Sequence, residues 1–373
     1  MSANMEMVWD APAHTLAKIQ MVRKYLSVWL SILGATFKGV DLWYIDGFAG
    51  PGEYTNPADG SPVAALQAAD EALTKTAGWV AGDVHCVFIE SDRPRFANLE
   101  KVLAAIPERS KVTRHLINGT FIEGIAALAQ TRPNPFSPPT PLFAFIDPFG
   151  VVGFPFAVVK ELLSRKNCEV LINLDSDGAA RVYHAGDFAN HRVVLNETFG
   201  DDEWEAVLAR TPRHQIAHKI LSLYKERLRA IPNVNYAFPF EMQKTAGKID
   251  YHLVFATKHP LGLQKMKEVM RQFAKDGVYA FSDERDNGQS TLLQFEEPAA
   301  HAEQLATAFR GRTVKYSEVN DYALNDSPFL NPKQMLAELE RADRLTVSCT
   351  KVKRRKCTYP EDTHPSMTIT FPG

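Results

Sequence analysis

The sequence predicts an α/β fold, namely a Rossmann-like, doubly wound and mostly parallel sheet, followed by a smaller winged-helix-like domain. Between residues 40 and 174, short β-branched and aromatic runs alternate with segments of helical periodicity. The runs are apolar throughout, which is typical of parallel strands covered by helices on both faces. The first run ends in a glycine-rich loop, the place where such folds bind nucleotides.

The expected elements follow in order from the N-terminus. An amphipathic helix over 14–33 precedes a strand over 40–45. Ser61 and Pro62 are typical of a helix start, with Ser61 as the N-cap and Pro62 at the first helical position. The alternation that follows consists of a helix to about residue 76, strands over 84–90, 112–117, 142–146 and 169–174, and helices over 93–105 and 122–130.

Two later strand-like runs, 250–256 and 290–295, flank a helix around 263–273 and are expected to complete a seven-stranded sheet. The segment 187–231 has mostly helical character, which favours a cap inserted over the site. We therefore expect residues 1–311 to form one Rossmann-like domain.

Residues 312–373 follow a different pattern, with helices near 316–323 and 332–342 and strands over 345–350 and 367–371. Two helices followed by a strand pair with a charged turn predict a winged-helix-like domain. The turn carries five candidate phosphate contacts, Lys351, Lys353, Arg354, Arg355 and Lys356. A solvated turn and a protein-interaction module are the alternatives.

Composition narrows the class of protein. The net charge of -2 gives no general attraction to nucleic acid or to an anionic membrane, so nucleic-acid contact requires a local basic patch. The four cysteines are widely scattered, which argues against a metal site. The most apolar stretch, 142–159, is interrupted by proline, glycine and aspartate and does not suit a membrane span. Without a recognisable signal peptide, the expected compartment is the cytoplasm.

The loop over 46–52 has the sequence Asp-Gly-Phe-Ala-Gly-Pro-Gly, whose glycines let the backbone approach a ligand closely. Its spacing differs from the dinucleotide fingerprint, and no lysine follows as in a phosphate-binding loop, which favours S-adenosylmethionine over NAD or ATP. The expected cofactor contacts are Asp46, Gly47, Phe48, Gly50 and Gly52. A tight turn without a ligand is the alternative.

The next two strands end in polar residues that suit the rest of a nucleoside. Glu90 is expected to accept hydrogen bonds from the ribose hydroxyls, with Asp92 as the second choice. After the third strand, Thr120 or Asn118 is expected at the adenine. Helix capping is the alternative for Glu90 and Asp92, and ordinary turn chemistry is the alternative for Asn118 and Thr120.

The fourth strand ends in Asp147-Pro148-Phe149-Gly150. This is similar to the Asp-Pro-Pro-Tyr/Phe motif of methyltransferases that modify exocyclic amino groups of bases, although the second proline is missing. In that chemistry the aspartate accepts a hydrogen bond from the target amine and the aromatic ring stacks on a flipped base. Asp147 and Phe149 are therefore the candidate catalytic residues.

Together, these segments resemble the three-Cys-motif partner protein family of bacteria and phages. The matching pieces are His14-Thr15 with Lys18, Arg23-Lys24-Tyr25-Leu26, the loop over 46–52, Gly60-Ser61-Pro62, residues 145–150 and Thr257-Lys258-His259-Pro260-Leu261-Gly262. The resemblance implies a class I methyltransferase-like fold and a separate partner that carries three cysteines and looks like a radical S-adenosylmethionine protein.

Three functions follow as hypotheses. The first is an S-adenosylmethionine-dependent methyltransferase that acts on a nucleic-acid base or nucleotide, since methyl transfer needs mainly positioning and a desolvated pocket. The second is a non-catalytic binding or specificity subunit of the three-Cys-motif partner, because fold alone does not establish catalysis. The third is a DNA-binding regulator whose sensor domain derives from an enzyme.

Overall fold

The computed structural model describes residues 8–56, 58–185, 188–245, 248–274, 280–282, 298–349 and 354–373. The chain divides into two compact units, which are described separately. The first contains residues 1–258 with 280–285, and the second contains residues 259–279 with 286–373. Within the described residues, no helix is both long enough and apolar enough to cross a membrane.

The first unit is built on a sheet of eight strands in the order β10-β8-β9-β7-β6-β1-β4-β5. Five neighbouring strands run parallel: β1 (Leu42–Asp46), β4 (Val84–Glu90), β5 (Val112–Asn118), β6 (Leu142–Ile146) and β7 (Cys168–Leu174). β9 (Lys248–Thr257) is antiparallel to β7 and β8 (Tyr236–Thr245), and β10 (Ala280–Ser282) pairs parallel with β8. The Rossmann-like sheet expected from the sequence is thus confirmed.

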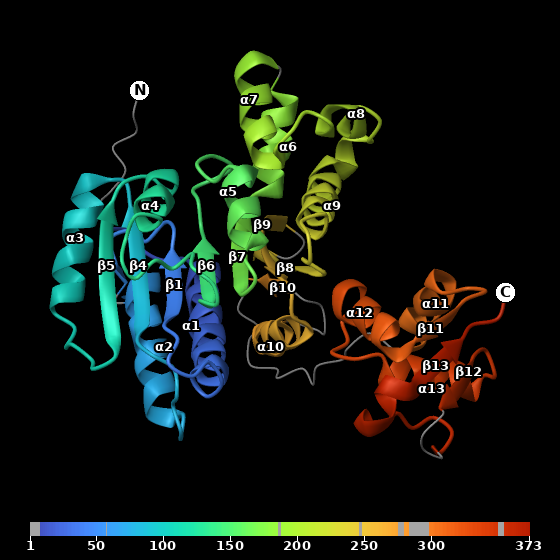
Figure 1. Cartoon of the computed structure of the whole chain (residues 1–373). Helices are drawn as coiled ribbons and strands as arrows, with labels where there is room; N and C mark the ends of the chain where they lie inside the picture. Colours follow the sequence, from blue (N-terminus) through green and yellow to red (C-terminus); the bar gives the residue numbers. More distant parts are fainter. Residues whose placement is uncertain are drawn as a thin grey trace. The chain divides into compact units, whose positions relative to one another are not determined.

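Helices cover both faces of this sheet (Figure 1). On one face α1 (Ala13–Gly34) packs beside α2 (Ser61–Lys75), and the Tyr25 ring of α1 meets Phe143 of β6 edge-on at 5.1 Å. The other face carries α4 (Phe121–Leu128) and α5 (Phe156–Ser164). α3 (Arg93–Ala104) connects β4 to β5. Alternate residues of each strand therefore enter two separate hydrophobic layers.

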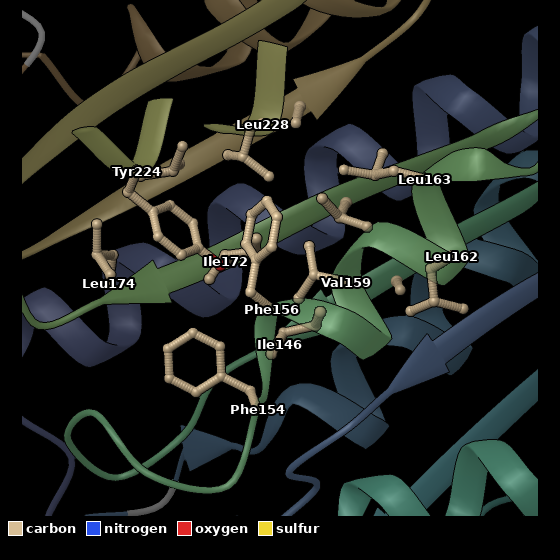
Figure 2. Packing of buried hydrophobic residues seen from close by; sticks show 14 of the residues in the cluster. Ile146, Phe154, Phe156, Val159, Leu162, Leu163, Ile172, Leu174, Tyr224 and Leu228 are labelled. Carbon is tan, nitrogen blue, oxygen red and sulfur yellow. The ribbon is translucent and has the colours of Figure 1, made fainter. Parts of the chain in front are cut away.

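An inserted group of helices completes the second face. It consists of α6 (Ser176–His184), α7 (Phe188–Phe199), α8 (Trp204–Leu208), a 3-10 turn (Arg213–Gln215) and α9 (Ile216–Arg229). Figure 2 shows Tyr224 and Leu228 of α9 packed with Val159 of α5 over the strand residues Ile146 and Ile172. The segment 187–231 is thus mostly helical, and its helices share the hydrophobic core of the sheet.

One expectation differs from the structure, and another falls outside the described residues. Ser61 is not the N-cap of α2: Gly60 occupies that position, and Ser61 begins the helix itself. The expected strand over 290–295 lies outside the described residues, and the strand that pairs with β9 on its outer side is β8, which the sequence did not predict. β8 contains Pro239, which has no N–H to donate to the hydrogen bonds between strands. Because proline is rare inside strands, the sequence does not predict a strand here.

The second unit has its own sheet and core. Its elements are α10 (Pro260–Met270), α11 (Pro298–Ala308), β11 (Thr313–Lys315), α12 (Tyr316–Asp326), α13 (Lys333–Arg341), β12 (Thr346–Cys349), a 3-10 helix (Glu361–Ser366) and β13 (Met367–Thr370). The three strands are antiparallel in the order β11-β13-β12. Leu305, Val319, Leu336 and Ile369 pack in one hydrophobic cluster.

Candidate active site

The loop after β1 adopts a conformation that requires glycine. Gly50 and Gly52 have φ angles of +63° and +87°, which side-chain-bearing residues rarely adopt. At Gly47 the restriction is steric, because a Cβ atom would lie 2.7 Å from the Phe121 ring of α4. The glycines predicted as cofactor contacts are thus each demanded by the backbone path or by packing.

The same loop is fastened to the start of α2. The N–H of Gly60 donates to the carbonyl oxygen of Gly52 at 2.9 Å, and a Cβ on Gly60 would approach that oxygen to 2.6 Å. A short antiparallel pair, β2 (Glu53–Tyr54) and β3 (Ala58–Asp59), connects the two points. The Gly-Ser-Pro segment therefore closes the glycine loop onto a helix N-terminus.

Asp46 lies at the end of β1 and is fully buried. Its Oδ1 accepts a 3.3 Å hydrogen bond from the Phe48 N–H, whereas its Oδ2 is buried and has no hydrogen-bond partner within the described residues. Burial raises the pKa of Asp46 to about 7; Asp147 and Glu90 add to the rise, and the Ser61 hydroxyl and Phe48 N–H oppose it. A buried acceptor without a partner is a position suited to a ligand donor.

Glu90 ends the neighbouring strand β4 and holds two loops together. Its Oε2 accepts the N–H of Gly50 at 2.9 Å, and its Oε1 accepts the N–H of Asp92 at 2.7 Å. The carboxylate of Asp92 instead caps α3 by accepting the N–H of Arg95. Of the two acidic residues considered for the ribose, Glu90 is the one whose carboxylate lies against the glycine loop.

The side chains after β5 serve local structure. Thr120 is the N-cap of α4 and forms a reciprocal capping box with Glu123, in which its hydroxyl also donates to the Glu123 carboxylate at 2.8 Å. The Asn118 side-chain amide donates to the carbonyl oxygen of Glu90 at 2.8 Å. The Phe48 ring stacks near Phe121, with centroids 5.7 Å apart. The contacts of Thr120 are therefore those of a helix N-cap, which the sequence analysis did not predict for it.

Asp147, at the end of β6, is paired with a lysine of α1. Lys18 Nζ lies 2.7 Å from Oδ1 and 2.5 Å from Oδ2, and the Asn173 amide donates to Oδ1 at 2.7 Å. The Lys18 side chain is 8% exposed and that of Asp147 is 20% exposed. Asn173 was not predicted, because it lies inside the apolar run of β7 and only the sheet brings it to Asp147.

Phe149 follows two residues later and is 64% exposed. Its ring lies 5.9 Å from that of Trp9, and the Arg95 guanidinium lies over both rings, 4.9 Å from Trp9 and 5.4 Å from Phe149. Tyr54 meets Trp9 edge-on at 5.7 Å. Sequence reasoning missed Trp9, Tyr54 and Arg95, since no motif joins them to the aspartate.

The predicted phosphate contacts belong to the second unit. Lys351 and Lys353 lie outside the described residues. Arg354 forms an ion pair with Glu340 of α13, in which both side chains are at least nine-tenths buried, and Lys356 pairs with Asp343 at 2.7 Å. Arg355 is exposed. Arg354 thus supports the fold of its unit, while Arg355 and Lys356 lie at the surface.

No family model and no curated protein matches the sequence. Among solved structures, the chain is similar to Trm1 from Pyrococcus horikoshii in complex with S-adenosyl-L-methionine (11% identity, 99% of this chain, 93% of that chain, TM-score 0.37). It is also similar to an O-methyltransferase from Bacillus cereus in complex with SAH (14%, 65% and 90%, TM-score 0.35). At such identities and scores, these likenesses assign no substrate or reaction to this chain.

Proposed function

We propose that this chain is an S-adenosylmethionine-dependent methyltransferase acting on a nucleic-acid base or nucleotide. The observation that carries the proposal is the buried Oδ2 of Asp46, which has no hydrogen-bond partner among the residues that the structure describes and which lies beside the glycine loop that Glu90 holds. The sheet supports it as well, because an antiparallel pair, β8 and β9, extends the five parallel strands as in the class I methyltransferase fold.

The residues at this edge fit the cofactor. Asp46 Oδ2 is available to an ammonium or hydroxyl donor, and each Glu90 oxygen accepts one backbone N–H and keeps a further lone pair for a ribose hydroxyl. Gly47, Gly50 and Gly52 leave the loop backbone free of side chains, and Phe48 lies beside it. When bound, S-adenosylmethionine would supply an electrophilic methyl group.

Asp147 and Phe149 would orient the acceptor. Asp147 would accept a hydrogen bond from the exocyclic amine, while Lys18 and Asn173 hold its carboxylate in one orientation. Phe149 would stack on the base. In this arrangement the chain contributes positioning and exclusion of water, which is what methyl transfer mainly requires.

The Lys18–Asp147 ion pair favours a second candidate. A carboxylate already engaged by an ammonium group and an amide is a weaker acceptor for a substrate amine. The chain would then be a methyltransferase-like binding or specificity subunit, and its partner would be the three-Cys-motif protein that the sequence resemblance implies.

We further propose that the second unit is a winged helix. The chain order α11-β11-α12-α13-β12-β13 and the strand order β11-β13-β12 support this, with the wing between β12 and β13. Arg355 and Lys356 would contact phosphates, or a protein partner, from that wing. A filter-binding assay at low salt tests the nucleic-acid role. The role is excluded if the protein retains negligible DNA, or if replacing Arg355 and Lys356 with neutral residues does not change the amount of DNA retained.

Calorimetric titration with S-adenosylmethionine and S-adenosylhomocysteine tests the cofactor site. Glu90→Ala should weaken binding about 10- to 100-fold, because hydrogen bonds to a charged group are lost. Glu100→Ala, at an exposed carboxylate of α3, is the matched control and should bind as the wild type does. No heat from the wild type at high ligand concentration would refute the proposal, and binding without methyl transfer to DNA, RNA or nucleotides would favour the second candidate.

A further inference from the structure

The helical segment between β7 and β8 carries a run of basic residues that contains no acidic one. Between residues 206 and 225 the sequence has four Lys or Arg residues, two His residues and no Asp or Glu. The basic residues of this run are Arg210, Arg213, His214, His218, Lys219 and Lys225. The whole chain has a net charge of -2, so this concentration of positive charge is local. A local patch is the feature through which such a chain can attract a polyanion.

The basic side chains of this run are open to solvent. Arg210, Arg213, His214 and His218 are exposed, and Lys219 is half-buried. Arg210 follows α8, Arg213 begins the 3-10 turn, and Lys219 lies in the first turn of α9. Among the residues that the structure describes, none forms an ion pair with these three cations, and the first turn of α9 has no acidic residue. We call Arg210, Arg213 and Lys219 the basic patch.

The acidic residues just before the basic patch are engaged by other arginines. Arg227 and Arg192 each pair with two of them. The pairs are Arg227 with Asp201 and Glu203, and Arg192 with Asp202 and Glu205. The patch is therefore left without a counter-charge among the described residues. Like charges that lie close together lower the stability of the folded state, so the fold gains nothing from the patch, whereas an anionic ligand would neutralise it.

The direction of the chain places the start of α9 at the edge of the sheet that carries the candidate site. α9 leads into β8, whose first residue, Tyr236, pairs with Thr257 of β9. The Thr257 hydroxyl donates to Glu169, near the start of β7, at 2.6 Å. The end of α9 thus connects to the edge at which the parallel strands begin. Because α9 packs beside α6, which follows the carboxyl end of β7, its first turn lies toward the opposite edge (Figure 1).

Electrostatics at His252 support this position. His252 pairs with Leu174, the last residue of β7. The pKa of His252 is lowered to about 4, mainly by burial and further by the charges of His218 and Lys225 of α9. β6, whose end carries Asp147, is the neighbouring strand of β7. The basic patch and the candidate acceptor site therefore share one edge of the first unit.

We propose that the basic patch contacts the phosphate backbone of a nucleic acid whose base reaches the candidate site. The inference rests on the proposed function, for which it names a polynucleotide, and not a free nucleotide, as the substrate class. Arg and Lys bind phosphates through charge and counterion release, and these contacts fix the position of a strand without reading its sequence. The patch is separate from Arg355 and Lys356 of the second unit, of which Lys356 is already paired with Asp343.

Binding of labelled strands over a series of salt concentrations tests the basic patch, with fluorescence anisotropy as the readout and no methyl donor present. The probes are a short RNA single strand and a DNA duplex, both of mixed sequence. The patch variant is Arg210→Gln/Arg213→Gln/Lys219→Gln. The matched control, Lys101→Gln/Lys160→Gln/Lys166→Gln, neutralises three exposed lysines elsewhere in the first unit and so changes the net charge equally.

We expect the slope of log K against log salt to fall by about 2–3 in the patch variant, because roughly 0.7 to 0.9 counterions are released for each phosphate that a cation neutralises. The control variant should keep the slope of the wild type. No binding of the wild type to either strand would overturn the proposal. An equal change of slope in both triple variants, or a change only in Arg355→Gln/Lys356→Gln, would overturn it as well.

Two other polyanions decide the class of partner. Vesicles that contain phosphatidylglycerol and a polyglutamate chain are titrated against the same proteins. Patch-dependent binding to either of them that is tighter than binding to the strands would overturn the assignment to nucleic acid, and weaker binding would support it.

Calorimetric titration with S-adenosylhomocysteine keeps the two proposals apart. The patch variant should bind this ligand as the wild type does, and urea denaturation shows that both triple variants are folded. If the ligand binds in a Glu90-dependent way but no strand binds, the patch proposal fails and the cofactor site stands. If strands bind in a patch-dependent way but the ligand does not, the contact with nucleic acid stands and the methyltransferase proposal fails.

Discussion

Replacing Lys18 with methionine removes the cation that pairs with Asp147 and retains most of the apolar length of the side chain. The carboxylate of Asp147 then keeps the Asn173 amide at 2.7 Å and loses both short contacts to Nζ. Since Lys18 is almost fully buried, water does not readily replace the ammonium group.

Removing one partner of a buried ion pair costs about 3–5 kcal/mol, and the partial exposure and remaining amide of Asp147 reduce our expectation to about 2–3 kcal/mol. For a unit of this size that corresponds to a fall in Tm of roughly 4–10 °C. Urea denaturation followed by tryptophan fluorescence measures the loss directly, because all five tryptophans lie within residues 1–258 and report the first unit.

The double variant Lys18→Met/Asp147→Asn is the control, because the neutral side chain no longer needs a cation. We expect it to recover part of the lost stability, with a coupling free energy of about 1–3 kcal/mol between the two positions. Two results would show that the ion pair does not stabilise the site. One is a decrease in the free energy of unfolding of less than about 0.5 kcal/mol in Lys18→Met, and the other is an equal decrease when Lys18→Met is made in the Asp147→Asn background.

Three further changes test other parts of the structure. The pKa of Asp46 is about 7 in the folded protein and about 3.8 in the unfolded chain, so the wild type loses stability as the pH rises from 4 to 8. Asn cannot ionise, so the free energy of unfolding of Asp46→Asn should exceed that of the wild type by up to about 4 kcal/mol at pH 8, as measured by denaturation across this range. Gly60→Ala should lower the urea midpoint by pressing a Cβ against the Gly52 carbonyl, costing about 1–3 kcal/mol. Arg354→Met should destabilise the second unit by about 3–5 kcal/mol in circular dichroism melts, because the buried Glu340 loses its cation and, among the described residues, keeps only the Cys357 N–H and the Tyr359 hydroxyl as donors. Unchanged values would contradict each expectation.

The alternation of strands and helices, and the edge of the sheet at which the candidate site lies, can be predicted from the sequence alone. Apolar runs of strand length and helical periodicity are local properties, and they predicted β4 and β6 with the bounds that the structure has. The carboxyl ends of parallel strands meet at one edge of a sheet, so the order of strands and acidic residues along the chain is enough to predict that Asp46, Glu90 and Asp147 lie at the same edge.

The contacts that each of these groups makes depend on the tertiary structure and could not be predicted from the sequence. Trp9 reaches Phe149 from a segment without regular structure, and Asn173 reaches Asp147 from the neighbouring strand of the sheet, so no local sequence pattern predicts either contact. Arg354 likewise belongs to an ion pair with a buried glutamate because α13 packs beside it, although its sequence context is a basic run. Periodicity encodes which face of an element is buried, whereas pairing between distant polar groups depends on how the elements assemble.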